Sequence, residues 1–198
     1  MSGVNKILVL FVHPAVHKSR INYRMLKAIE GMEHITIVRL YDEYPDFHIN
    51  IKREQDRLVE HDIVVWHHPF YWYSAPSMLK EWIDLVLEHG FAYGRKGMAL
   101  KGKKVMSALS TGGRFEAYKE GGYNNFSIDQ FMAPYKQTVQ LCRMEYLPPF
   151  VIHGTHLLSE TEITSCAEDY RKILVSLRDG LLNYDELHSY GYINDLLK

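Results

Sequence analysis

The sequence has few of the features that mark membrane, secreted or disulfide-rich proteins. Only two of its 198 residues are cysteine, Cys142 and Cys166, and they form neither a CxxC pattern nor a disulfide scaffold. The apolar run from Ile7 to Val12 has six residues, whereas a signal-peptide core needs at least about 7 and a membrane span about 20. No later stretch comes closer to spanning a bilayer. These absences favour a reduced, cytoplasmic protein.

An excess of charge of one sign is also lacking. The chain has 23 basic and 24 acidic residues, for a net charge of −1 with the histidines neutral. A nucleic-acid-binding surface needs a basic surplus, so nucleic acid is not an expected partner. The hydrophobic content, 46%, is higher than disordered chains have. We therefore expect a globular protein with one domain over residues 1–198.

The motifs of common nucleotide and metal sites are missing too. The chain has neither a GxGxxG nor a Walker pattern, which disfavours a dinucleotide loop and a P-loop. His13 and His17 would share a face only on a helix, and Pro14, directly after a strand, argues against one there. His67 and His68 are adjacent and point to opposite faces of an extended strand. No metal site is predicted.

What the sequence does contain is a regular alternation of strand and helix patterns. Strands are predicted at residues 6–12, 34–40, 62–67, 103–110 and 146–153, the last broken by two prolines, and helices at about 23–30, 52–60, 77–88, 128–141 and 160–181. Residues 42–50 and 111–125 are predicted to be loops, with a polar tail from about residue 184. The continuous apolar runs suit strands that are covered on both faces.

This alternation predicts an α/β fold of right-handed βαβ units. We expect a flavodoxin-like three-layer sandwich, with a five-stranded parallel sheet in the order 2-1-3-4-5. In such sheets ligands bind beyond the carboxyl ends of the strands, near the point where the strand order reverses. The site is therefore expected after the first, third and fourth strands.

The segment after the first strand runs from His13 to Asn22 into a helix. Ser19, Arg20 and Asn22 offer donors beside the unpaired N–H groups of the helix start, a combination that suits a phosphate. The alternative is an ordinary helix cap, in which Ser19 only satisfies the first turn.

Two further segments follow the third and fourth strands. Pro69 to Pro76 holds four aromatic residues in a row, which either form a platform for a flat ring or pack onto the domain or a partner. Ser110-Thr-Gly-Gly113 lets a ligand approach the backbone closely, or it is a tight turn.

Taken together, the segments resemble the flavin-dependent NAD(P)H:quinone oxidoreductases of the flavodoxin-like fold. The matching segments are His13-Pro14 with Ser19 to Asn22, Tyr44 to Phe47, His68 to Ser74, Leu79 to Asp84, Gly90 to Gly94, Thr111 to Gly113 and Leu147 to Phe150. The resemblance is strongest to the ancillary quinone reductases of bacterial glutathione-gated potassium-efflux systems and their general NAD(P)H-oxidoreductase relatives. It covers residues 7 to about 155.

The resemblance implies a non-covalent flavin in a homodimer, with FMN favoured and FAD as the alternative. His13, Ser19, Arg20, Ile21 and Asn22 would surround the phosphate and ribityl chain, Pro69, Phe70, Tyr71 and Trp72 would lie along the ring system, and Ser110, Thr111, Gly112 and Gly113 would contact its polar edge. NAD(P)H would donate a hydride and a quinone would take two electrons, in a ping-pong sequence. Tyr71, Trp72 and Phe91 would line the substrate slot.

One position departs from the family pattern. Some members use a Tyr and a His after the two glycines to handle a proton at the flavin. Tyr118 stands at the Tyr position and is the expected catalytic residue, but Asn124 occupies the His position and does not protonate near neutral pH. A Tyr–His pair at these two positions is therefore not expected.

Two other classes of function stay open at this stage. One is a regulatory flavoprotein that docks on a potassium-efflux transporter at the inner membrane, an idea that only the resemblance motivates. The other is a one-electron carrier of the flavodoxin type, although such carriers are typically acidic and this chain is nearly neutral.

Overall fold

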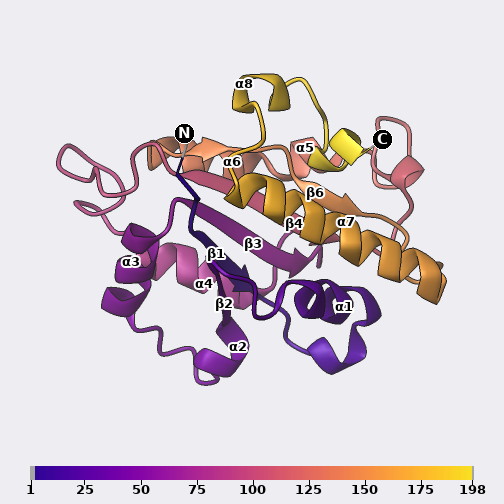
Figure 1. Cartoon of the computed structure of the whole chain (residues 1–198), viewed down its shortest axis with the longest axis horizontal. Helices are drawn as coiled ribbons and strands as arrows, with labels where there is room; N and C mark the ends of the chain where they lie inside the picture. The colour runs from indigo at the N-terminus through magenta and orange to yellow at the C-terminus, as the bar shows by residue number, and fades with distance from the viewer. Residues whose placement is uncertain (1–2, 198) are drawn as a thin grey trace.

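A parallel sheet forms the centre of the structure (Figure 1). The computed structural model describes residues 3–197. The strands are β1 (Ile7–Phe11), β2 (Ile35–Arg39), β3 (Ile63–Pro69), β4 (Lys104–Ser110), β5 (Glu145–Tyr146) and β6 (Phe150–Ile152). They lie in the order β2-β1-β3-β4-β5, and every pair is parallel. The predicted flavodoxin-like order is confirmed.

The fifth predicted strand is two short strands. β5 pairs with the start of β4 and β6 with its end, and the two prolines at 148 and 149 separate them. A proline has no N–H to donate to the ladder, so the pairing is interrupted there. The predicted break at these prolines is found, and it divides the fifth strand into two.

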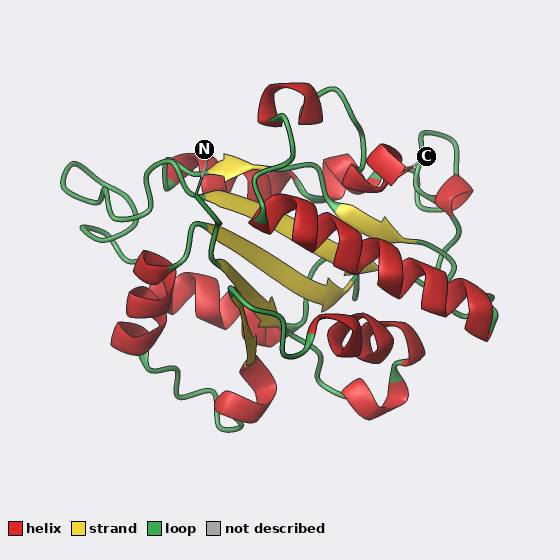
Figure 2. Cartoon of the chain, in the orientation of Figure 1, coloured by secondary structure: helices red, strands yellow, loops and turns green. Residues whose placement is uncertain are grey.

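Helices cover both faces of the sheet (Figure 2). One face packs against α1 (Arg20–Ile29) and α7 (Glu160–Arg178). The other packs against α3 (Ile51–Glu60), α4 (Ser77–Val86) and α6 (Ala133–Leu141). Alternate residues of β1 enter the two cores, Leu8 and Leu10 on the α4 side and Ile7 and Val9 on the α7 side. This explains why the strand is apolar at every position.

Several helices differ from the sequence prediction, and α4 and α7 end two and three residues early. Helix α1 begins at Arg20, three residues early, because Ser19 accepts a hydrogen bond from the Asn22 N–H and caps the helix. The predicted helix over 128–141 is α5 (Ile128–Phe131) followed by α6, with Pro134 in the first turn of α6. A short helix, α2 (Leu40–Glu43), begins the stretch that was expected to be a loop.

The C-terminal segment is ordered against the sheet. It contains α8 (Tyr184–Leu187) and a 3-10 helix at Ile193–Leu197. Leu187 and Ile193 are buried in the core on the α7 side. The Asn194 side chain donates to the Val151 carbonyl and accepts from the Val151 N–H, at 3.1 and 2.8 Å, so it continues the pairing of β6. Among the described residues no helix is long and apolar enough to cross a membrane.

Candidate functional site

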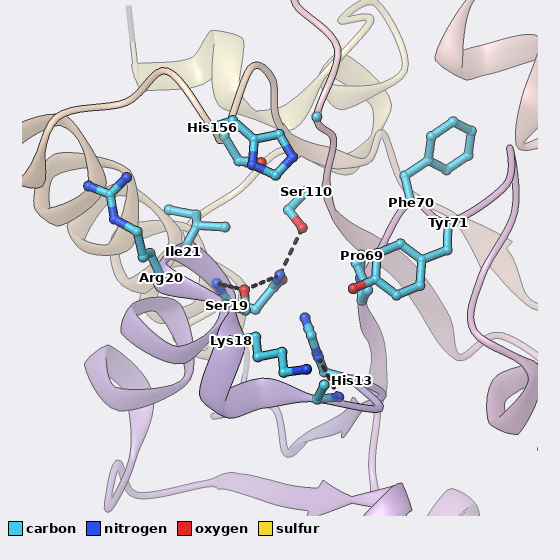
Figure 3. Close-up of a pocket in the computed structure, with 14 residues that line it drawn as sticks. His13, Lys18, Ser19, Arg20, Ile21, Pro69, Phe70, Tyr71, Ser110 and His156 are labelled. Atoms are coloured by element: carbon cyan, nitrogen blue, oxygen red, sulfur yellow. Dashed lines mark hydrogen bonds between the residues drawn. The ribbon is translucent and has the colours of Figure 1, made fainter.

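A cavity of about 390 Å³ opens at the carboxyl ends of β1, β3 and β4. Figure 3 shows residues from all three strand-end segments around it. The lining residues are His13, Ala15, Lys18, Ser19, Arg20, Ile21, Asn22, Pro69, Phe70, Tyr71, Ser110, Gly112, Thr155 and His156. Of the residues predicted to hold the cofactor, all but Trp72, Thr111 and Gly113 line this cavity.

Asn22 joins the helix start to the end of β4. Its side-chain Nδ2 donates to the Ser19 hydroxyl at 2.9 Å and to the Ser110 hydroxyl at 2.8 Å (Figure 3). Its amide oxygen is buried and has no hydrogen-bond partner among the described residues. An unpaired buried acceptor is costly, so its retention marks a place where a ligand donor is expected.

The guanidinium of Arg20 is turned away from the helix start. It donates to a carboxylate oxygen of Glu160 at 2.7 Å and to the Leu158 carbonyl at 3.1 Å. In Figure 3 this side chain points away from Ser110 and Pro69. The ion pair lowers the pKa of Glu160. Arg20 therefore lies at the rim of the cavity, which Lys18 also lines.

His13 faces the cavity as a neutral side chain. Burial lowers its pKa to about 4, with a smaller contribution from His17. Its Nδ1 accepts a hydrogen bond from the Ala15 N–H at 3.1 Å, so the proton of the neutral ring is on Nε2. The ring is therefore a donor without a charge.

The aromatic segment after β3 divides into an inner and an outer part. Phe70 is 8% exposed and Tyr71 43% exposed, and both line the cavity. Trp72 and Tyr73 have φ angles of 50° and 62°, a left-handed conformation that non-glycine residues rarely adopt. This turn directs Trp72 into solvent, where it is 93% exposed.

A second cavity of about 340 Å³ shares Phe70 with the first. Its lining residues are Phe70, Trp72, Tyr73, Gly113, Ala117, Tyr118, Tyr123 and Asn124. Trp72, Gly113 and Tyr118 are thus brought together in this neighbouring cavity. Phe91 lies elsewhere, packed against the core on the α4 side, and lines neither cavity.

The two glycines after β4 lie against the rings of two other side chains, so there is little room for a larger residue at either position. A Cβ at Gly112 would lie 3.2 Å from the ring of His156, and one at Gly113 would lie 3.0 Å from the ring of Tyr118. Thr111 is buried, and its hydroxyl donates to the Gly113 carbonyl at 2.8 Å. The turn therefore depends on glycine at both positions, and this glycine cradle presents the Gly112 backbone to the cavity.

Tyr118 packs behind this turn. It is 8% exposed, and its ring lies 5.9 Å from that of Phe70 and 5.5 Å from that of His153, measured between centroids. Asn124, the residue at the expected His position, accepts a hydrogen bond from the Tyr73 hydroxyl at 3.4 Å.

Sequence reasoning missed four lining residues. Ala15 and Lys18 fall inside the segment singled out after β1, so its boundaries contained the signal. Thr155 and His156 follow β6, a strand end that the sequence analysis did not examine for ligands.

A family model described as "Flavodoxin-like fold" matches residues 5–174. The chain belongs to this flavodoxin-like family. The match ends inside α7, so α8 and the segment after it lie beyond the matched region.

The chain is also similar to individual proteins and solved structures. The chain is 38% identical over 177 residues to the glutathione-regulated potassium-efflux system ancillary protein KefF of Klebsiella aerogenes, covering 89% of this chain and 99% of that one. The crystal structure of general stress protein 14 from Treponema denticola, in complex with FMN, has a TM-score of 0.83 and 35% identity, and covers 87% of this chain and 99% of that one. An NADPH-quinone reductase from P. pentosaceus has a TM-score of 0.77 and 29% identity, with 85% and 96% covered.

Proposed function

We propose that this chain is an FMN-dependent NAD(P)H:quinone oxidoreductase. The observation that carries the proposal is the cavity at the ends of β1, β3 and β4. It combines a capped helix start, a glycine cradle and an aromatic wall. The names of the relatives support the same class, since one is a quinone reductase and another was crystallised with FMN.

The residues present fit a flavin nucleotide. The buried amide oxygen of Asn22 lacks a hydrogen-bond partner among the described residues, and Gly112 lines the cavity without a side chain. The volume of about 390 Å³ falls within the range of roughly 300–1,000 Å³ that small-molecule sites occupy.

We assign the phosphate to the start of α1. The first N–H groups of a helix have no partner within the helix, and its dipole favours an anion there. Ser19 and Asn22 hold this end of the helix against Ser110, and Lys18 adds a positive charge at the cavity. Ile21 lines the wall, and the neutral His13 adds a donor from Nε2.

We assign the ring system to the space between the aromatic wall and the glycine cradle. When bound, the flavin supplies a two-electron carrier that takes a hydride from NAD(P)H and passes it to a quinone, in a ping-pong sequence. Pro69, Phe70 and Tyr71 would exclude water from one side. Backbone N–H groups of Gly112 and Gly113 would stabilise the negative charge that gathers at the polar edge on reduction.

We assign the substrate to the second cavity, next to the ring. Trp72 and Tyr73 stand at its rim, and Tyr118 forms its inner wall. The Tyr118 hydroxyl is the proposed proton donor to the quinone when the quinone is reduced. Replacing Tyr118 with Phe should lower turnover with a quinone and leave FMN affinity unchanged; unchanged turnover would remove Tyr118 from the mechanism.

The decisive experiment is anaerobic spectroscopy of the purified protein with FMN. Bleaching of the flavin bands by NADH or NADPH, and their recovery on adding a quinone, is the expected result. Binding without bleaching would indicate a carrier or a sensor, and no binding of FMN would contradict the proposal. Chromatography of the released cofactor separates FMN, which we expect, from FAD.

We further propose that the protein is a homodimer. The rim of the second cavity carries exposed aromatic side chains, with Trp72 93% and Tyr123 90% exposed, and such surfaces commonly form interfaces. Light scattering should give about 46 kDa, twice the chain mass of 23.2 kDa. A mass of one chain would contradict the dimer.

A regulatory role is the second candidate function, because a relative is named as an ancillary protein of a potassium-efflux system. In this role the chain would act in the cytoplasm and bind a transporter at the inner membrane. A change in glutathione-gated potassium flux when the chain is added would support it. If the flux did not change, the regulatory role would be contradicted and the oxidoreductase activity would be the one remaining candidate function.

A further inference from the structure

A chain of partly buried hydrogen bonds holds the turn between Thr111 and Gly113. The Thr111 hydroxyl donates to the Gly113 carbonyl at 2.8 Å and also lies 3.2 Å from Nδ1 of His153. His153 follows β6 and has no role in the proposed mechanism. Thr111 is 1% exposed, so water does not compete for these bonds.

The chemistry of the three groups fixes the direction of the chain. A carbonyl can only accept, so the single hydroxyl proton of Thr111 points to Gly113. Toward His153 the same hydroxyl oxygen must then accept, and Nδ1 must carry a proton. Burial lowers the pKa of His153 to about 4, so the ring is neutral near pH 7. The proton is therefore on Nδ1, and Nε2 is unprotonated.

Three aromatic rings lie around the half-buried imidazole. Its ring lies 5.5 Å from those of Phe115 and Tyr118 and 5.6 Å from that of Tyr192, measured between centroids. Its Nε2 is buried and has no hydrogen-bond partner among the described residues. The Nδ1 contact is thus the polar contact that orients the ring. Tyr192 belongs to the C-terminal segment, which lies beyond the matched family region.

The turn also has backbone support that does not depend on this histidine. The Gly154 N–H donates to the Gly113 carbonyl at 2.8 Å, and the Thr155 N–H donates to the Thr111 carbonyl at 3.0 Å. These bonds tie the turn to the end of β6. A variant at position 153 is therefore expected to fold with the turn in place but with its hydroxyl and peptide groups less well oriented.

We propose that His153 is a positioning residue of the flavin site, which acts as a fixed N–H donor through Thr111 on the Gly112–Gly113 turn. The inference rests on the proposed function, because it concerns the N–H groups assigned to the polar edge of the flavin. His153 stands beside Tyr118 but does not replace the proton-carrying His of the family. It orients the turn and stays neutral throughout.

Two substitutions separate the hydrogen bond from the packing. His153→Leu keeps an apolar side chain of moderate size and removes the donor. His153→Asn keeps a donor, because its Nδ2 lies at the same distance along the side chain as Nδ1 of His. Leu should weaken FMN binding about tenfold and lower the midpoint potential of the bound flavin, while Asn should restore affinity to within about threefold. A Thr111→Val background should abolish the difference between Asn and Leu.

The readouts are FMN titration by fluorescence, redox titration, and long-range ¹⁵N spectra of the flavin-free protein. The spectra should show the Nδ1–H tautomer of His153, whether or not flavin binds. Equal impairment by Leu and Asn, no impairment by Leu, or an Nε2–H tautomer would each overturn the inference. If the unaltered protein bound no FMN, the proposed function would fail together with it, whereas failure of the inference alone leaves FMN binding intact.

Discussion

Single side chains decide what the strand-end cavity can hold. The sequence predicts most of its lining because the residues directly follow strands, and the carboxyl ends of parallel strands meet at one edge of the sheet. What it cannot predict is a contact between distant segments. Arg20 was assigned to a phosphate on its position alone, but it pairs with Glu160, 140 residues further along the chain.

The position of Asn22 makes it the most informative single substitution for cofactor binding. Asn22→Asp removes the donor to Ser19 and Ser110 and places a carboxylate at the proposed phosphate site. Like charges a few ångströms apart in a partly buried site repel by a few kcal/mol, so FMN should bind about 100-fold more weakly. Fluorescence titration measures this affinity.

Lys27→Gln is the matched control for that experiment. It changes the net charge by the same amount on the same helix, but Lys27 is exposed and pairs with Glu30. FMN affinity should be unchanged in this variant. If both variants bound FMN equally well, the phosphate would not lie at the start of α1.

Glu54 is a buried carboxylate whose role is structural. It is 0% exposed and accepts hydrogen bonds from the Tyr44 hydroxyl at 2.7 Å and from Trp82 Nε1 at 2.9 Å, and it forms an ion pair with Arg57. Removing the carboxylate takes the acceptor from the Tyr44 hydroxyl and from Trp82 Nε1, while Arg57 keeps its ion pair with Glu43. Each buried donor left without a partner costs about 1–3 kcal/mol. Urea denaturation of Glu54→Ala should show this loss, while Glu60→Ala, at an exposed position on the same helix, should change stability by less than about 0.5 kcal/mol.

At the scale of elements, segments with a strong hydrophobic pattern were predicted correctly, and segments with a weak pattern were not. The central strands were predicted from apolar runs that two covered faces require. The C-terminal segment gave no usable pattern, because its few buried residues, Leu187 and Ile193, are separated by polar ones. Only the structure shows that Asn194 completes the edge of β6.

Asn194 should therefore stabilise this edge of the sheet. Val151 is 5% exposed, and both of its backbone groups pair with the Asn194 side chain. Asn194→Ala would leave a buried N–H and carbonyl unpaired, at a cost of about 1–3 kcal/mol. Hydrogen exchange of residues 150–152 should accelerate. Asn194→Asp keeps the acceptor for the N–H and should give a smaller effect; equal exchange in all three proteins would contradict the pairing.

At the scale of the whole molecule, the alternation of elements was enough to predict the topology. Right-handed crossovers and a core on each face restrict the sheet to doubly wound orders, of which 2-1-3-4-5 suits five strands. Topology does not determine which buried positions are polar. His67 and His68 are both 0% exposed within the two cores, a placement that the adjacent-residue pattern alone could not reveal.

These two histidines predict that the protein loses stability in mild acid. Burial lowers the pKa of His67 to about 3 and that of His68 to about 4, whereas an unfolded histidine titrates near 6.5. Between about pH 6.5 and 4 the unfolded chain binds more protons, so stability is complete above that window and falls as the pH falls through it. Each histidine contributes a slope of about 1.4 kcal/mol per pH unit.

Urea denaturation at several pH values measures this slope. His67→Phe should reduce it, because neither ring nitrogen of His67 has a hydrogen-bond partner among the described residues and its neighbours include the rings of Phe11 and Tyr170. The exposed His48, changed to Gln, serves as the control and should leave the slope as it is. If His67→Phe did not change the dependence of the unfolding free energy on pH, His67 would not contribute to the loss of stability in acid.

The placement of the three tryptophans gives the protein a built-in optical reporter. Trp66 and Trp82 are each 1% exposed in the core on the α4 side, whereas Trp72 is 93% exposed at the rim of the second cavity. Unfolding would shift the emission of the first two to longer wavelength. A ring bound in the second cavity would quench the third. One fluorescence spectrum, without any label, can therefore follow folding and substrate binding separately.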